Sequence, residues 1–98
     1  MRRKIDLEKK QADGYSIPIG PINLVFIVTD KGMLACGAFD VAALNNFAYP
    51  AAKAKSKSGA PIATIEDLID GTVKEANAEA GKLGISAGMS CKKALELL

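Results

Sequence analysis

Residues 23–38 read Asn-Leu-Val-Phe-Ile-Val-Thr-Asp-Lys-Gly-Met-Leu-Ala-Cys-Gly-Ala, and this stretch decides the fold. The part from Asn23 to Thr29 is almost continuously apolar and rich in β-branched residues, which is typical of a central strand covered on both faces. Asp30 to Gly32 then predict a three-residue hairpin loop in which Gly32 takes the left-handed conformation. We expect Met33 to Ala38 to return antiparallel, so the fold is built on a β-hairpin.

Two further strands are expected on the N-terminal side of this hairpin. Residues 4–10 alternate apolar and charged side chains, as a half-exposed strand does. Asp13-Gly14 is typical of a turn, and residues 15–19 then alternate again. Because Pro18 has no N–H to donate to a ladder, this second strand should be short or lie at a sheet edge.

Residues 40–58 predict one helix and one uncertain segment. Asp40 is a good N-cap for a short helix over residues 41–47. Residues 51–58 alternate small residues with three lysines, which predicts either an exposed edge strand or a mobile loop.

Three capping signals follow in the last part of the chain. Thr64-Ile65-Glu66-Asp67 predicts the start of a short helix. Thr72-x-x-Glu75 is a full capping box and predicts a second helix that ends at Gly84. Ser90 is expected to cap a last helix whose apolar stripe includes Cys91.

Strands in the first half and helices in the second half predict an α+β fold. We expect a single domain over residues 1–98, with a mostly antiparallel sheet of about five strands and helices packed on one face. Within this domain, residues 1–12 are expected to form an N-terminal strand or arm.

The composition narrows the classes of partner. The formal net charge of +2 is too small and too dispersed for a nucleic-acid partner to be expected. No apolar run reaches the length of a membrane span and no signal-peptide core is present, so we expect a cytoplasmic protein without membrane contact. Sixteen alanines and no tryptophan leave only a modest core, which favours a homo-oligomer.

The sequence contains no histidine, which excludes Ser-His-Asp and Cys-His catalytic pairs and every histidine-ligated metal site. Only two cysteines are present, and they do not form a Cys-x-x-Cys pair. We therefore expect no metal site, no cofactor and, in the cytosol, no structural disulfide.

Cys36 and Gly37 lie where the returning strand is expected to give way to a helix, with Asp40 and Asn45 following them. A helix N-terminus can favour a thiolate, and a glycine lets a ligand or another backbone come close. Cys36, Gly37, Asp40 and Asn45 are therefore candidate ligand-binding residues, and Cys36 is the candidate catalytic residue. Simpler interpretations stay open, because Cys36 can be a buried strand residue and Asp40 only a helix cap.

Other candidate positions have simpler explanations. Cys91 falls on a helix stripe and is expected in the core. Lys53, Lys55 and Lys57 could contact a phosphate, although alternating lysines on an edge more often form a solvated face.

Several segments carry a family resemblance, namely Cys36-Gly37-Ala38-Phe39-Asp40-Val41, Leu44-Asn45, Thr64 to Leu68, Gly84-Ile85-x-x-Gly88-Met89-Ser90 and Ala94-Leu95. From about Asp13 to its C-terminus the chain resembles the YunC-like family, small bacterial and archaeal proteins of unknown function. This resemblance implies a compact α+β fold and a homo-oligomer, with a trimer as one form. It implies no activity.

Three functions are compatible with these observations. The first is a small ligand-binding or accessory domain with its site at the Cys36-Gly37-Asp40 junction, which would bind a small ligand or a protein partner. The second is a thiol-dependent enzyme that uses Cys36 and therefore needs this thiol exposed. The third is a purely structural interaction module, which leaves Gly37 beside Cys36 without a reason.

Overall fold

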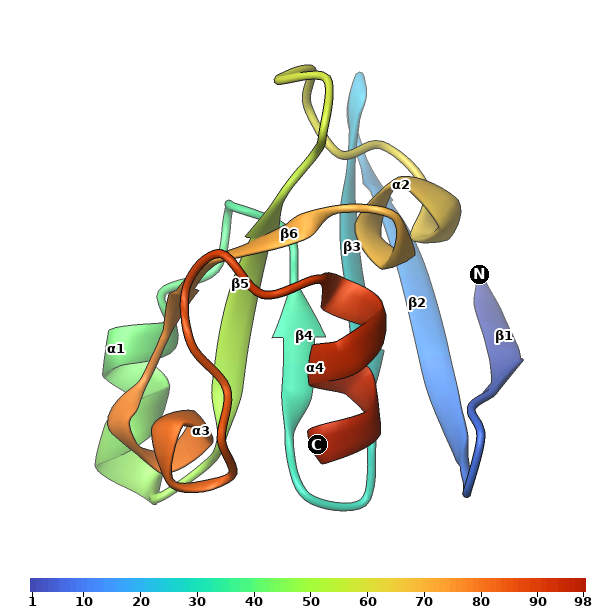
Figure 1. Cartoon of the computed structure of the whole chain (residues 1–98). Helices are drawn as coiled ribbons and strands as arrows, with labels where there is room; N and C mark the ends of the chain where they lie inside the picture. Colours follow the sequence, from blue (N-terminus) through green and yellow to red (C-terminus); the bar gives the residue numbers. More distant parts are fainter.

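The hairpin expected at residues 23–38 forms the middle of the sheet in the computed structural model, which describes residues 1–98 (Figure 1). The strands are β1 Arg2–Asp6, β2 Gln11–Ile19, β3 Ile22–Val28, β4 Met33–Ala35, β5 Ala51–Lys55 and β6 Thr72–Ala76. They lie in chain order in one sheet, β1-β2-β3-β4-β5-β6. Only β4 and β5 pair in parallel. The predicted α+β class is therefore confirmed, with six strands instead of about five.

The helices are all short. They are α1 Val41–Leu44, continued by the 3-10 turn η1 Asn45–Phe47, then α2 Ile65–Ile69, α3 Ala78–Lys82 and α4 Cys91–Leu97. The caps at Asp40, Thr64 and Ser90 form as expected, each with its side chain accepting a backbone N–H. None of the helices is long and apolar enough to pass through a bilayer.

The main core lies between the sheet and the helices α2 and α4. It holds 17 buried residues, of which the largest fully buried ones include Ile27, Leu34, Leu68 and Leu95. A second cluster of four, Met33, Ala35, Val41 and Ala51, lies on the opposite face of the sheet beneath α1, so the helices are not all packed on one face as the sequence predicts. This second face is used because the parallel pair β4 and β5 needs a crossover connection, and α1 lies in it.

Several local predictions are wrong. The strand that contains Pro18 is neither short nor at an edge, because β2 has nine residues and lies between β1 and β3. Residues 72–76 form strand β6 and not a helix, because Val73 pairs with Ala54 on one side and exchanges backbone hydrogen bonds with Met89 and Gly88 on the other. Asp13-Gly14 lies inside β2, where both residues pair with β3. Strand β5 is interior, between β4 and β6, and is not an edge.

Gly32 is also not left-handed; only Gly20, Gly59, Gly84 and Gly88 among the glycines have a positive φ. Glycine is required at position 32 because the Pro50 backbone leaves no room for a side chain. A Cβ there would overlap the carbonyl oxygen of Pro50, which precedes β5. The start of β4 is thus held against the start of β5 by a close backbone approach.

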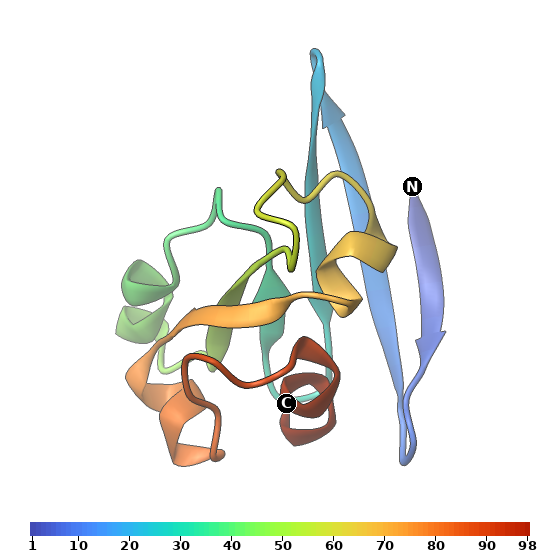
Figure 2. The ribbon, with the colours of Figure 1, turned by 45° about the horizontal axis from the view of Figure 1, so that its top comes forward.

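Strands β2 and β3 are longer than their neighbours and extend past the sheet as a hairpin (Figure 2). We call residues 16–24 the arm. The arm turns at Gly20, which has a φ of 56°.

Candidate functional site

The segment that follows β4 is a tight turn. The Cys36 N–H donates to the carbonyl oxygen of Val25 at 3.0 Å, and the Cys36 carbonyl accepts from the Phe39 N–H at 3.3 Å. The Cys36 side chain belongs to the main core and is only 5% exposed. It also lines a hollow of about 270 Å³ beside the arm. The thiol is therefore a wall of this hollow and is not freely presented to solvent.

Gly37 is exposed and unconstrained by its own chain. A Cβ built at this position has no other heavy atom within 4 Å, and its φ is not in the left-handed region. Neither packing nor backbone conformation within one chain therefore requires a glycine here.

Gly37, Pro61 and Ile62 each line two adjoining hollows, which we together call the Gly37 cleft. The apolar hollow of about 270 Å³ is lined by Ile22, Asn23, Leu24, Cys36, Gly37, Ala38, Pro61 and Ile62. The basic hollow of about 310 Å³ is lined by Gly37, Ala54, Lys55, Ser56, Gly59, Ala60, Pro61, Ile62 and Lys74. Each is close to the lower limit of about 300 Å³ for pockets that hold small molecules.

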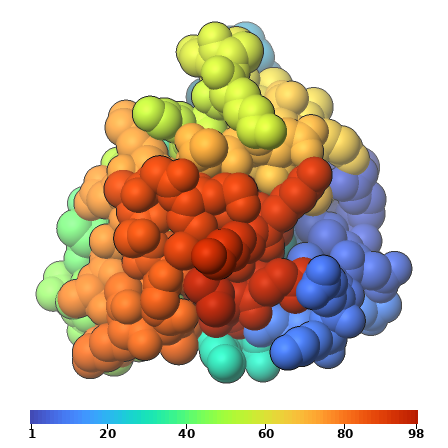
Figure 3. All heavy atoms as spheres, in the orientation of Figure 1, coloured from blue at the N-terminus to red at the C-terminus, as the bar shows by residue number.

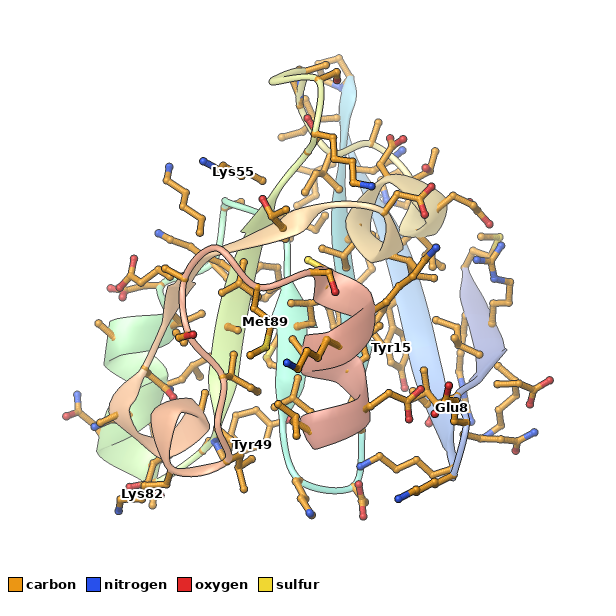
Figure 4. All side chains as sticks on the ribbon, viewed as in Figure 1. Glu8, Tyr15, Tyr49, Lys55, Lys82 and Met89 are labelled. Atoms are coloured by element: carbon orange, nitrogen blue, oxygen red, sulfur yellow. The ribbon has the colours of Figure 1, made fainter.

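The basic hollow owes its charge to Lys55 and Lys74, neither of which forms an ion pair. Lys53, in contrast, pairs with Glu75 at 3.3 Å. The register of β5 and β6 shifts between Lys53 and Ala54, which leaves Lys74 without a partner residue. A bulge of this kind changes the direction in which a side chain points. Here the bulge lies where the ammonium groups of Lys55 and Lys74 line the same hollow. Figure 4 shows Lys55 at the end of the molecule that also carries the loop after β5.

The same end of the molecule carries loop 56–60 and the tip of the arm (Figure 3). Within this loop, Ser56 Oγ bonds to Ser58 Oγ and to the carbonyl oxygen of Ala60. At the foot of the loop, Gly71 lies so close to Lys55 that an added Cβ would overlap the Lys55 carbonyl oxygen. The backbone of Lys55 is thus fixed against the chain that leads into β6.

Asp40 and Asn45 lie outside the Gly37 cleft, and each has a structural contact. Asp40 Oδ1 accepts the Ala43 N–H at 3.1 Å and caps α1. Asn45 Oδ1 accepts the Glu79 N–H at 3.0 Å and joins η1 to α3. Of the four candidate residues, the fold therefore brings only Cys36 and Gly37 to the cleft.

Asn77 is the most extensively bonded polar side chain and is buried. Its Oδ1 accepts the N–H groups of Ala51 and Ala80 at 3.1 and 2.9 Å. Its Nδ2 donates to the carbonyl oxygens of Val41 and Tyr49 at 3.0 and 2.8 Å. All of its hydrogen-bonding capacity is used inside the fold, so it holds α1, β5 and α3 together and is unavailable to a ligand.

Cys91 begins α4 and is fully buried, as expected. Burial raises the pKa of the Cys91 thiol to about 12. Such a thiol stays protonated near neutral pH and is unreactive.

The largest hollow, about 740 Å³, is elsewhere. It lies between the β1–β2 turn and α4, near Glu8 in Figure 4, and is lined by Ile5, Asp6, Leu7, Glu8, Ile69, Lys92, Lys93, Leu95 and Glu96. Volume alone favours it as a ligand site. Its rim mixes three carboxylates with two lysines, however, and Glu96 already accepts the Glu8 N–H at 2.9 Å. It offers no cluster of one charge, and none of the four candidate residues reaches it.

No three His, Cys, Asp or Glu side chains gather closely enough to hold a metal ion. The residues of the Gly37 cleft instead combine apolar side chains with two ammonium groups. Such a surface can hold a small molecule that has an apolar part and an anionic group.

Comparisons with known proteins agree on the relatives of this chain. The family model described as a domain of unknown function (DUF1805) matches residues 35–98, which include Cys36, Gly37 and Lys74. The uncharacterized protein YunC of Bacillus subtilis (strain 168) is 29% identical over 96 residues, which cover 93% of this chain and 89% of YunC. The crystal structure of a protein of unknown function from Thermoplasma acidophilum has the same fold, with a TM-score of 0.87 at 24% identity. That match covers 98% of this chain and 89% of the other.

Proposed function

This chain belongs to the family described as a domain of unknown function (DUF1805), and from the chemistry of its own surface we propose that it binds a small ligand in the Gly37 cleft. The ligand would have an anionic group held by Lys55 and Lys74 and an apolar part against Cys36 and Ile62. We further propose that the protein is cytoplasmic and works as a homo-oligomer.

The observation that carries this proposal is the open position of Gly37. Glycines 32 and 71 are explained by backbone oxygens that exclude a Cβ, but nothing within the chain excludes one at Gly37. A glycine that lines both hollows leaves room for a ligand to approach the backbone. The two unpaired lysines beside it supply the charge for an anion.

The thiol-dependent alternative receives less support. A nucleophilic thiol needs exposure and a neighbouring base or cation, whereas Cys36 is nearly buried and the Asp40 carboxylate is engaged in capping α1. We therefore assign Cys36 to the apolar lining of the cleft.

The proposal is tested with phenyl phosphate as the probe, which joins an apolar ring to an anionic group. We expect the backbone amide signals of Gly37, Ser56 and Gly59 to move on titration, as followed by ¹H–¹⁵N NMR. Inorganic phosphate and phenol, which carry one half of the probe each, should bind more weakly. Signals that move around Leu7 and Lys92 instead would transfer the site to the larger hollow.

Charge reversal provides the matched variants. Lys55→Glu with Lys74→Glu should weaken binding of the probe about tenfold or more, since each removes a cation and adds an anion. Lys9→Glu with Lys31→Glu is the control, because it changes the net charge by the same amount and because both lysines are exposed and line neither hollow of the cleft. Equal loss in both variants would mean that only the net charge matters, and would contradict the proposed site.

A further inference from the structure

The two edges of the sheet differ in what lies beside them. At β6, residues 88–91 of the same chain bond to the outer side, where Val73 donates to Met89 and accepts from Gly88, both at 2.8 Å. At β1, no strand pairs with the outer side, and Figures 1 and 2 show this strand at the end of the sheet. An open edge of this kind can pair with a further strand.

The backbone groups left free at this edge belong to alternate residues. Met1 exchanges two backbone hydrogen bonds with Ser16, and the Leu7 N–H donates to the Lys10 carbonyl oxygen at 2.8 Å, so the odd-numbered residues bond to β2. Because these bonds alternate along an antiparallel pair, the even-numbered residues direct their N–H and C=O groups away from the sheet. Within β1 these residues are Arg2, Lys4 and Asp6.

The next residue in this row already has an acceptor. The Glu8 N–H donates at 2.9 Å to the carboxylate of Glu96, which belongs to α4. An oxygen acceptor from outside the β1–β2 ladder thus bonds to the row at one position. The carbonyl oxygens of an extended peptide are acceptors of the same kind and would bond to the N–H groups of Lys4 and Asp6.

The largest hollow of the molecule, about 740 Å³, lies beside this row. Its apolar lining comes from Ile5 and Leu7, from Ile69 of α2 and from Leu95 of α4. Ile5 and Leu7 pack on the face of the sheet that α2 and α4 cover. Every second side chain of an added strand would point to the same face, so the hollow can receive apolar side chains at alternate positions.

The charges on the opposite face of β1 change sign along the strand. Arg2 and Lys4 share one carboxylate, that of Asp13, at 3.4 and 3.0 Å, which leaves a positive charge uncompensated. Asp6 and Glu8 form no ion pair. Opposite charges in directly facing residues of two strands stabilise the pair. An antiparallel strand with a basic residue followed by acidic ones is therefore complementary to β1.

We propose that β1 binds an extended peptide segment of another protein as an additional antiparallel strand. Apolar side chains at alternate positions of the peptide lie in the large hollow, while a basic residue faces Asp6 and an acidic residue faces Lys4. No residue lines both this hollow and the Gly37 cleft, so the proposal is independent of the ligand proposed for that cleft.

The probe is the hexapeptide Val-Lys-Val-Glu-Val-Glu, blocked at both ends, whose lysine faces Asp6 and whose first glutamate faces Lys4. Amide hydrogen exchange followed by ¹H–¹⁵N NMR reads out the edge directly. The Ile5 N–H should be protected with and without the probe. The N–H groups of Lys4 and Asp6 should exchange freely in the protein alone and at least about tenfold more slowly with the probe. The peptide Val-Val-Lys-Glu-Glu-Val is the control, because it has the same composition without the alternation.

Lys4→Pro and Lys4→Ala are the matched variants. Both lose the ion pair with Asp13, but only proline removes the outward N–H, and proline is tolerated at such a position of an edge strand. We expect Lys4→Pro to bind the probe at least about tenfold more weakly than Lys4→Ala, with circular dichroism showing that both are folded.

Three results would overturn the proposal. The first is equal binding of the probe by the two folded variants. The second is unchanged exchange at Lys4 and Asp6 in wild type at about 5 mM probe, which needs no variant. The third is protection of these two N–H groups in the protein alone, since a second copy of the chain would then cover the edge.

Discussion

The two ends of β4 differ sharply although they are only a few residues apart. At its start, Gly32 lies against the carbonyl oxygen of Pro50, which also accepts the Met33 N–H at 3.0 Å, and the neighbouring backbone is bonded to Asn77. At its end, Gly37 has free space around it and lines two hollows. One end is fixed by contacts within the chain, and the other is left open.

This difference separates residues that stabilise the fold from residues available for binding. Gly32 and Asn77 have all their space or hydrogen bonds used inside the chain. Gly37, Lys55 and Lys74 have no partner that explains them. Substitutions at the start of β4 should therefore change the stability of the fold, and substitutions near its end should change ligand binding.

The largest effect is expected for Gly32→Ala. Its methyl group would overlap a backbone oxygen that cannot move without separating β4 from β5, so we expect a loss of about 3 kcal/mol or more in the free energy of unfolding. Urea denaturation followed by circular dichroism measures this loss. Wild-type stability in Gly32→Ala would mean that the Pro50 carbonyl oxygen can move aside without separating β4 from β5.

Asn77→Ala should follow, with a loss of about 2–3 kcal/mol, because two buried N–H groups and two carbonyls lose their partner. Asn45→Ala is the comparison, since it removes a single bond to the Glu79 N–H and should cost about 1 kcal/mol. Equal losses in the two variants would contradict the role of Asn77 as the central link.

The pH dependence of the free energy of unfolding should reveal the raised pKa of the Cys91 thiol. The pKa of the Cys91 thiol is about 12 in the folded state and about 9 in the unfolded chain, so the unfolded chain releases its proton first as the pH rises. The stabilisation is complete below about pH 9 and is lost progressively up to pH 12, and the loss at pH 10 is at most about 1.4 kcal/mol. Denaturation of wild type and Cys91→Ala at pH 7 and pH 10 should show a smaller decline in the variant, and parallel declines would refute this prediction.

The two thiols should also differ in their rates of alkylation. Cys36 lines the open cleft and should react with iodoacetamide at least about tenfold faster than Cys91 in the native protein. Peptide mass spectrometry after timed quenching measures both sites in one sample. If both thiols react only after denaturation, then the apolar hollow does not admit molecules of this size.

The smallest effect on stability is expected for Gly37→Ala, within about 0.5 kcal/mol of wild type, since the added methyl meets no atom. Binding of phenyl phosphate should nevertheless weaken, because the methyl group occupies the cleft. Gly81→Ala is the matched control, as Gly81 also has free space but lies in α3. A large loss of stability in Gly37→Ala would show that this glycine belongs to the scaffold.

Local signals predicted much of this fold. The apolar run of β3 and the capping residues of α2 and α4 act over a few residues, and all three elements form as expected. The sequence predicts a helix in place of strand β6 because Thr72 and Glu75 have the spacing of a capping box. The pairing of Val73 with β5 and with Met89 overrides that local preference, and neither partner is visible from the sequence nearby.

The candidate site was predictable only in part for the same reason. Cys36 and Gly37 are candidate site residues because of their residue types, and both line the cleft. Lys74 and Ile62 reach it through the sheet and a loop, so nothing in their local sequence indicates this position. A strand prediction for residues 72–76 would not provide that signal by itself, because Lys55 pairs with Thr72 and Lys74 lies at the register shift between β5 and β6.

The order of the strands has a consequence for folding kinetics. Three strand pairs, β1–β2, β2–β3 and β3–β4, are joined by short turns, whereas β4–β5 and β5–β6 must first close the connections of residues 36–50 and 56–71. Closing these connections costs entropy before any contact repays it, so β5 should join the sheet late in folding. The walls of the Gly37 cleft follow strands β4 and β5. Hydrogen exchange should therefore find the cleft among the first regions to open and the β2–β3 ladder among the last.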